Sequence, residues 1–193
     1  IPTIRRPVPV PRAQSATDVR KVLDACHCER DRAIVWLMVG LGLRRMEVAG
    51  LRWDHYDERS QPLTVAVSKN DRQRVLPVTE EVATALRPLR VATTGAVIRS
   101  HRDGGGITPE QVGRIVSSAM AEAGVKLHAY DGVSGHALRH TCASDVLDGC
   151  HDLRVVQQML GHAQLSTTAI YLRRATDEGI RDAMGGRRYG EVA

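Results

Sequence analysis

The sequence predicts an α+β fold that is mainly helical and contains one small antiparallel sheet. Several segments place apolar residues at the three- and four-residue spacing of a buried helix face, and most follow a Ser, Thr or Asp that can cap a helix. Only one pair of neighbouring segments alternates apolar and polar residues as strands do. A chain of 193 residues without an internal repeat is long enough to build this fold around one core.

The first part of the fold is predicted to contain three helices. Ser15 caps a helix that runs to about Cys26, with Asp18 at capping-box distance. A second helix over about 31–40 is apolar on every side, which places it in the centre of the domain. Gly40 and Gly42 end it, and 44–50 forms a short helical piece.

A hairpin follows these helices. Leu63–Val67 alternates as a strand, and a polar turn over 68–73 leads into the returning strand Arg74–Val78. Lys69 lies at the turn. A helix over about 79–88 comes next.

The best-marked helix begins after Thr108. Pro109 suits its first position, and Gln111 lies three residues after the Thr108 cap, where it completes a capping box. Gly124 ends this helix. Three further short helices are expected over 136–147, 153–160 and 167–174, the last two capped by Asp152 and Ser166.

The two ends of the chain differ from this domain, which we place at 15–174. Residues 1–14 are rich in proline and arginine and predict an extended basic linker between domains. Because the sequence begins at Ile1, we expect a fragment that lacks an upstream domain. Residues 175–193 form a short tail, for which a frayed terminus and packing on a neighbouring subunit are both open interpretations.

Composition limits the classes of partner. The net charge of +5 and the pI of about 9.3 suggest a polyanion such as nucleic acid. All but three of the 27 basic residues are arginine, and the aromatic residues are four Tyr and two Trp with no Phe. So few aromatic rings exclude a base-stacking surface for single strands as the main binding mode.

The sequence does not predict a membrane, secreted or metal-binding protein. It contains no apolar run of about 18 residues and no secretory start. The four cysteines are expected to be reduced thiols in a cytoplasm. The Cys26-His27-Cys28 and Cys150-His151 groups lack the two- to four-residue spacing of structural zinc ligands.

Candidate chemical residues concentrate near the carboxyl end. His136 and Arg139 are three residues apart and are expected to share a helix face. Gly161-His162 follows a predicted helix, and Tyr171 comes nine residues later. Arg44 and Lys69 from the first half can complete this set.

In order and spacing, these residues resemble the signature boxes of the tyrosine recombinases, the phage integrase family. The resemblance extends from about Ser15 to Tyr171. It rests on five short segments: Leu43-Arg44-Arg45-Met46-Glu47-Val48, Lys69 with Pro77, His136-Ala137-Leu138-Arg139-His140-Thr141, Leu160-Gly161-His162, and Tyr171.

The resemblance implies the catalytic domain of a site-specific recombinase. Such an enzyme integrates or excises DNA, such as a viral genome, through a covalent 3′-phosphotyrosyl intermediate without metal, ATP or another cofactor. By residue, it implies Tyr171 as nucleophile, Arg44 and Arg139 as the phosphate clamp, Lys69 as the acid for the leaving 5′-hydroxyl, and His136 and His162 as a supporting pair. Glu47 is implied to orient Arg44. The implied partners are double-stranded DNA attachment sites, three further copies of the chain in a tetramer, and accessory proteins that set direction, all in a bacterial cytoplasm.

Physical chemistry favours the same residue types. A phosphodiester under attack gains charge on its non-bridging oxygens, and guanidinium groups stabilise that charge in a bidentate geometry. A tyrosine with a pKa near 10 must lose its proton as it attacks, and His136 is a candidate acceptor. A flexible lysine at a hairpin turn can protonate the leaving oxygen.

Other interpretations stay open. Taken singly, Arg44 and Glu47 form a surface ion pair, His162 is a loop residue, Lys69 is a solvated charge and Tyr171 is a core residue. Arg45, Arg52 and Arg72–Arg74 are expected to contact phosphates or solvent and to take no part in chemistry. Two alternative functions are a type IB topoisomerase and a non-catalytic DNA-binding regulator.

Overall fold

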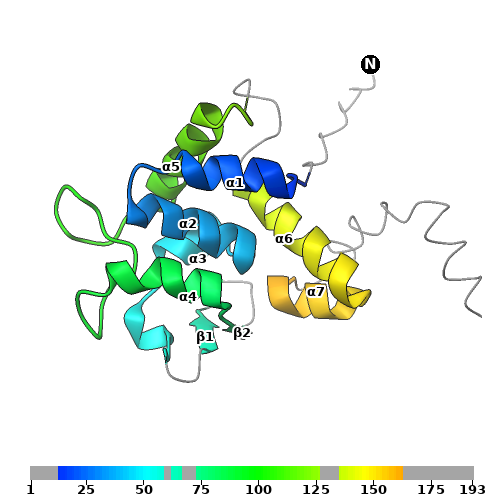
Figure 1. Ribbon diagram of the computed structural model, residues 1–193. Coiled ribbons are helices and arrows are strands. Elements are labelled where there is room, and N and C mark those ends of the chain that lie inside the picture. Colours follow the sequence, from blue (N-terminus) through cyan, green and yellow to red (C-terminus); the bar gives the residue numbers. More distant parts are fainter. Residues whose placement is uncertain (1–12, 59–61, 67–72, 127–134, 163–193) are drawn as a thin grey trace, which may run out of the picture.

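The computed structural model describes residues 13–58, 62–66, 73–126 and 135–162 (Figure 1). Within these residues, short helices dominate and two strands form a single sheet. In chain order, the elements are α1 (Ala16–Asp24), α2 (Glu29–Gly40), α3 (Arg45–Ala49), η1 (Trp53–His55), β1 (Pro62–Val65), β2 (Arg74–Pro77), α4 (Glu80–Leu86), η2 (Arg87–Leu89), α5 (Pro109–Glu122), α6 (Gly135–Cys150) and α7 (Leu153–Leu160).

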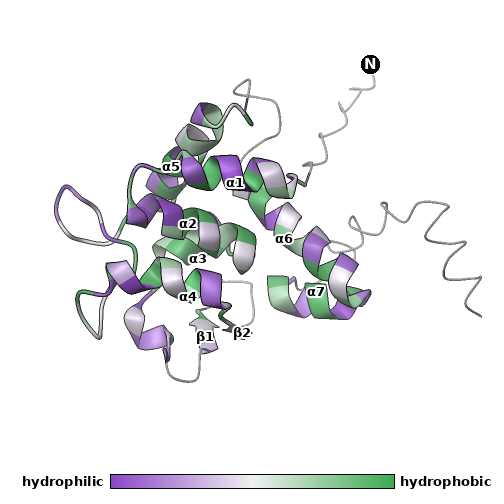
Figure 2. Cartoon of the chain, in the orientation of Figure 1, coloured by the Kyte–Doolittle hydropathy of each residue, from purple (hydrophilic) through white to green (hydrophobic). Residues whose placement is uncertain are grey.

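Helix α2 is the centre of the fold. It packs against α1, α3, α4, α5 and α6, and in Figure 1 it lies between α1 and α4. Because neighbours surround it, many of its apolar side chains are buried. Figure 2 shows the green of hydrophobic residues over much of this helix. The sequence prediction of a central buried helix is confirmed, and the helix begins two residues earlier than expected, at Glu29.

The hairpin is confirmed as an antiparallel pair. Leu63 of β1 pairs with Leu76 of β2, and Val65 pairs with Arg74. Since successive side chains of a strand point to opposite faces, these four residues share one face, and all four are buried. Arg74 therefore points into the protein together with leucine and valine side chains.

The predicted caps at Thr108 and Asp152 form as expected, whereas Ser166 lies outside the described residues. The Thr108 hydroxyl accepts a hydrogen bond from the Gln111 backbone at 3.2 Å, and the Gln111 side chain accepts one from the Thr108 backbone at 2.7 Å. These reciprocal bonds fix the start of α5. The Asp152 carboxylate accepts a hydrogen bond from the Arg154 backbone at 2.8 Å and caps α7.

The helix that carries His136 differs from its prediction in length. Helix α6 has 16 residues where a shorter helix was expected, and eight consecutive residues from Ala137 to Ser144 are buried. It reaches from α2 to α7, against both of which it packs.

Among the described residues, no helix is both long and apolar enough to span a membrane.

Four predictions concern segments that lie wholly or almost wholly outside the described residues. These are the basic linker at 1–14, the polar turn over 68–73, the helix expected over 167–174, and the tail at 175–193.

Candidate functional site

The site begins at the turn between α2 and α3. Gly42 adopts a φ of +62°, and a Cβ atom there would lie 2.9 Å from the Leu160 side chain. Glycine is therefore required both by the backbone angle and by the close approach of α7. The turn leads directly into Arg44, which occupies the N-cap position of α3.

Glu47 lies one turn into α3 and bonds back to Arg44. Its carboxylate accepts a hydrogen bond from the Arg44 backbone at 2.7 Å and one from the Arg44 guanidinium at 3.1 Å. The Glu47 side chain is only 5% exposed, so this is a partly buried pair and the surface-pair interpretation is wrong. These contacts fix the stem of Arg44 at the start of the helix.

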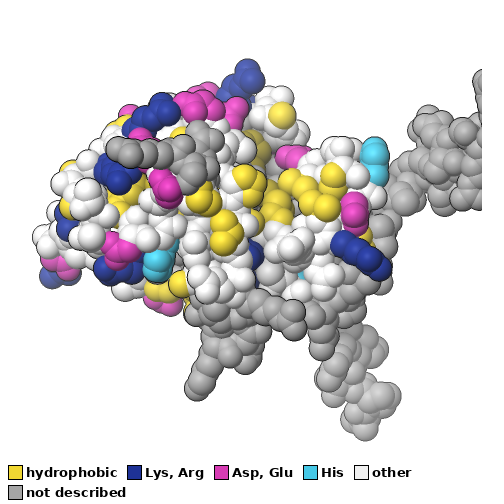
Figure 3. Space-filling model, turned by 90° about the horizontal axis from the view of Figure 1, so that it is seen from below, with side chains coloured by type: hydrophobic (Ala, Val, Ile, Leu, Met, Phe, Trp, Pro, Cys, Tyr) yellow, Lys and Arg dark blue, Asp and Glu magenta, His cyan; other side chains and the backbone are white. Residues whose placement is uncertain are grey.

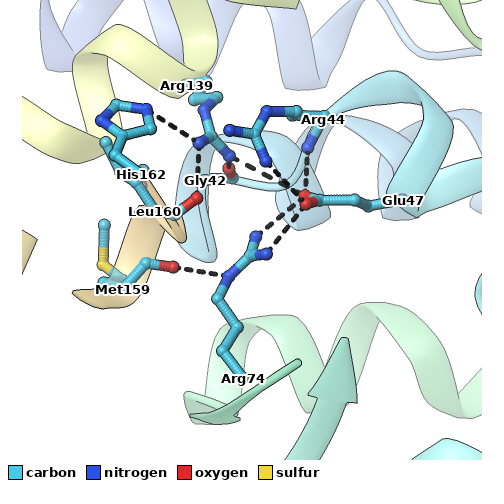
Figure 4. A network of polar contacts seen from close by, with 8 residues as sticks. All are labelled: Gly42, Arg44, Glu47, Arg74, Arg139, Met159, Leu160 and His162. Atoms are coloured by element: carbon cyan, nitrogen blue, oxygen red, sulfur yellow. Dashed lines mark hydrogen bonds and ion pairs between the residues drawn. The ribbon is translucent and has the colours of Figure 1, made fainter. Parts of the chain in front are cut away.

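Two further arginines meet the same carboxylate (Figure 4). Arg74 donates to both oxygens of Glu47 at 2.8 and 2.9 Å, and Arg139 lies 3.8 Å from one of them. Three guanidinium groups thus surround one acid, and the cluster carries an excess of positive charge. An excess of this sign suits an anionic ligand.

The pKa of Glu47 shows how these contacts act. Burial alone would raise the pKa of this carboxyl group. The hydrogen bonds from Arg74 and Arg44, together with the charge of Arg139, outweigh burial and lower the pKa below its usual range. Glu47 therefore stays ionised at neutral pH.

Arg139 connects three parts of the site. Its guanidinium donates to the carbonyl oxygens of Gly42 and Leu160, the latter at 2.7 Å, and one of its terminal nitrogens lies 3.2 Å from Nε2 of His162. The residue is only 5% exposed. The sequence placed Arg139 correctly on the helix that carries His136, but it gave no sign of this burial or of the carbonyl partners.

His162 follows the left-handed end of α7. Gly161 has a φ of +67°, and the His162 backbone donates to the Gln157 carbonyl at 3.1 Å. Because an arginine can only donate, Nε2 of His162 is the acceptor in this contact. The turn thus directs a histidine toward the buried arginine.

His136 lies near the exposed start of α6, on a cleft of about 380 Å³ that Arg44 and Arg139 also line. Arg45, Arg114 and Lys126 add further positive charge to this cleft, and Glu110 adds one negative charge. Partial burial lowers the pKa of His136, and the charges of Arg45, Arg139 and Arg44 lower it further. The ring is therefore neutral at pH 7 and can accept a proton.

The His136 titration gives a first prediction. Replacing Arg45 with alanine removes one positive charge that opposes protonation, so the pKa of His136 should rise toward its ordinary value of about 6.5. The ring proton signals in an NMR titration report this midpoint directly. In an Arg52→Ala control, which removes an exposed arginine paired with Asp54, the midpoint should not move. A midpoint unchanged by Arg45→Ala would contradict the assigned role of its charge.

Arg74 corrects one expectation. The sequence placed it with Arg72 among arginines that contact phosphates or solvent, yet Arg74 is 8% exposed and bonded to Glu47. It also donates to the Met159 carbonyl at 2.7 Å. The missed signal is the strand alternation, which puts Arg74 on the same face as Leu76 and Val78. Arg45 and Arg52 are exposed, which agrees with the expectation for them.

Arg74 and His162 line a second hollow of about 910 Å³ between β2 and α7. Figure 3 shows the underside of the molecule, where hydrophobic side chains gather near its middle. Val75 and Val155, which line this hollow, are among the exposed large apolar residues. Glu47 thus links the two hollows, because it contacts Arg44 and Arg139, which line the first, and Arg74, which lines the second.

The structure therefore brings together Arg44, Glu47, Arg139 and His162 in one bonded cluster, with His136 on the adjoining cleft. Lys69 and Tyr171 lie outside the described residues. In the described ranges, no three His, Cys, Asp or Glu side chains are grouped so that they could hold a metal ion. The arrangement can bind an oxyanion between guanidinium groups and offer it a neutral imidazole.

Comparison with known proteins agrees with this chemistry. The model of the family described as "Phage integrase family" matches residues 14–178. Tyrosine recombinase XerA of Pyrococcus furiosus is 31% identical over 185 residues, which cover 92% of this chain and 62% of the relative. Tyrosine recombinase XerC of Xylella fastidiosa is 37% identical over 145 residues, which cover 74% of this chain and 48% of the relative.

The fold comparison gives a similar result. A crystal structure of XerA recombinase matches with a TM-score of 0.76 and 27% sequence identity, covering 97% of this chain and 68% of that one. The chain thus spans about half to two thirds of the length of the proteins that it resembles.

Proposed function

Because this chain belongs to the phage integrase family of tyrosine recombinases, we propose that it is the catalytic domain of a site-specific DNA recombinase. In this proposal it cleaves and rejoins duplex DNA strands for integration or excision. The observation that carries the proposal is the cluster in which Glu47 and Arg44 meet a buried Arg139 beside a cleft containing His136. A cationic cleft of this kind suits a phosphodiester.

The proposed reaction is a transesterification at one phosphorus atom. The Tyr171 oxygen attacks, a tyrosine–phosphate bond forms, and the bond from phosphorus to the 5′-oxygen of the next nucleotide breaks. Neutral His136 accepts the tyrosine proton, and Lys69 gives a proton to the leaving oxygen. Because the intermediate is itself a phosphodiester, the 5′-hydroxyl of a second strand can reverse the step without ATP.

In this proposal, Arg44 and Arg139 hold the non-bridging oxygens and stabilise the charge that develops on them. Arg139 suits this task because its carbonyl partners and His162 fix its side chain before DNA arrives. Glu47 serves as the support that orients Arg44. No resident metal or other cofactor enters the proposed steps.

The wider assembly also belongs to the proposal. We place the protein in the bacterial cytoplasm, on double-stranded attachment sites, as a tetramer in which residues 175–193 pack on a neighbouring subunit. Residues 1–14 would connect the catalytic domain to an upstream domain, and accessory proteins would set the direction of recombination. No membrane takes part in the proposed assembly.

Covalent capture tests the proposed function. A library of duplexes with randomised cores and a nick beside each candidate cleavage position would be incubated with the protein, and denaturation-resistant adducts would be sequenced. The proposal expects adducts that share a core sequence. Adducts without shared sequence, together with relaxation of any supercoiled plasmid, would instead support a type IB topoisomerase. Binding without any adduct would support a DNA-binding regulator.

A second prediction concerns Lys69. Lys69→Ala should slow cleavage of the captured sequence by about 10²-fold or more, because the leaving 5′-oxygen loses its acid. A substrate with sulfur at the 5′ position needs no acid, so the variant should cleave it at nearly the wild-type rate. Single-turnover gel assays of both substrates measure this. Equal slowing on both substrates would remove Lys69 from the acid role.

A further inference from the structure

The proposed mechanism gives no role to Arg74, although this residue is bonded to Glu47 in the same cluster. Its two terminal nitrogens donate to the two oxygens of Glu47 at 2.8 and 2.9 Å, and its Nε donates to the Met159 carbonyl at 2.7 Å. Every nitrogen of the guanidinium thus has a protein acceptor. The side chain joins β2 to both α3 and the last turn of α7 (Figure 4).

Burial distinguishes this pair from an ordinary surface contact. The side chains of Arg74 and Glu47 are 6% and 5% exposed. A buried ionic pair in a planar, two-bond geometry is strongly directional, and loss of one partner leaves an uncompensated charge. Arg74 therefore determines where the Glu47 carboxylate lies.

The packing around Gly161 adds a second constraint. A Cβ atom on Gly161 would lie 3.0 Å from a terminal nitrogen of Arg74 and 3.3 Å from its Cδ. The Arg74 side chain thus passes directly against the turn that precedes His162. Its bond to the Met159 carbonyl also holds the last turn of α7, which leads into Gly161.

The distances around Glu47 show what this arrangement does for the neighbouring arginines. Arg74 makes the two short side-chain bonds, whereas the guanidinium of Arg44 is 3.1 Å and that of Arg139 is 3.8 Å from the carboxylate. Without Arg74, the ionised and buried Glu47 would attract these two groups more closely. Such a shift would draw them away from an incoming phosphate.

We propose that Arg74 is a positioning residue of this site, which acts through Glu47 on Arg44 and through the α7 end on His162 and does not contact DNA. This inference rests on the proposed function, because the position matters only if Arg44 and Arg139 bind the phosphate. It also gives the hairpin a second role. Strand β2, the next described element after Lys69 in the sequence, is bonded to the arginine cluster.

The test is Arg74→Lys, which keeps the charge beside Glu47 but cannot donate the parallel bonds. Adduct formation on the captured duplex should slow about 10- to 100-fold, as for small displacements of catalytic groups. The dissociation constant for DNA should change by less than about 3-fold. In Arg74→Gln, which removes the charge, the salt dependence of binding should be unchanged, whereas loss of an arginine that bound a phosphate would reduce the salt slope by about 1.

A double-variant cycle tests the route through Glu47. Arg74→Lys combined with Glu47→Gln should be about as slow as the slower single variant, because both changes disturb one unit. Multiplied effects, a reduced salt slope or an unchanged cleavage rate would each overturn the proposal. Arg90→Ala is the matched control, since Arg90 also pairs with a glutamate, Glu58, but outside the cluster.

A measurement without DNA separates this inference from the proposed function. In protein with labelled arginine and histidine, Arg74→Lys should move the Nε–H signal of Arg44 and the ring signals of His162, whereas Arg90→Ala should not. Unmoved signals overturn the inference even if the enzyme cleaves DNA. If the signals move but the wild-type protein forms no adduct on any duplex, the positioning contact stands and the recombinase proposal fails.

Discussion

Tyr171→Phe should abolish the covalent adduct with DNA while leaving DNA binding within about 2-fold of wild type. Phenylalanine keeps the ring and removes only the oxygen that forms the bond to phosphorus, so no other step of the proposed reaction is affected. The effect is the largest that the mechanism predicts, because a lost nucleophile cannot be compensated by the clamp. Denaturing gels of a single-turnover reaction measure the adduct, and fluorescence anisotropy measures binding.

Tyr130→Phe is the matched control for this change. It removes the same hydroxyl group from a tyrosine outside the signature segments, and adduct formation should be retained. An adduct of wild-type yield with Tyr171→Phe would show that another residue attacks the phosphorus.

The second large effect is expected at Arg139. Arg139→Ala should reduce the rate of adduct formation by about 10²- to 10³-fold, because it removes a fixed donor from the charge that develops in the transition state. It should also lower the free energy of unfolding by about 1–3 kcal/mol, since the Gly42 and Leu160 carbonyl oxygens lose their buried donor. Single-turnover assays and urea unfolding measure the two effects.

Arg139→Lys separates chemistry from folding. Lysine keeps the charge but cannot bond to both carbonyl oxygens and present a planar pair of donors to phosphate. We expect this variant to remain folded and still to cleave at least about 10-fold more slowly than wild type. Arg52→Ala, an exposed arginine paired with Asp54, is the control. A folded Arg139→Lys variant with the wild-type rate would remove Arg139 from the clamp.

Local signals made much of the fold predictable. Thr108, Gln111 and Asp152 cap their helices as expected, because a cap depends on residues only two or three positions away. The apolar residues of α2 lie on every side of the helix, and this pattern predicted that the helix is buried at the centre of the fold. The length of α6 was not predictable to this degree, since its buried middle contains polar residues such as Arg139, His140 and Ser144 that interrupt an apolar pattern.

The candidate site was predictable in its residue types but less so in its contacts. Motif spacing identified Arg44, His136, Arg139 and His162. The structure brings Arg44, Arg139 and His162 into one bonded cluster around Glu47. The partners of Arg139 are backbone carbonyl oxygens, which every residue carries and no sequence pattern marks. Arg74 was expected at the surface because it is charged, although the alternation of the strand places it on the buried face.

The roles of Lys69 and Tyr171 stay predictions, because both residues lie outside the described part of the chain. What the described residues contribute is the surroundings into which these two groups would have to fit. Those surroundings are a cationic cleft, a neutral His136 and a firmly bonded Arg139.

Locating the covalent bond tests the central claim most directly. The wild-type protein would be trapped on the captured duplex, digested with nuclease and protease, and the nucleotide-bearing peptide sequenced by mass spectrometry. We predict a single modified peptide with the 3′-phosphate on Tyr171. A phosphate attached to any other residue would contradict the proposed mechanism, as would the absence of a modified peptide after efficient DNA binding.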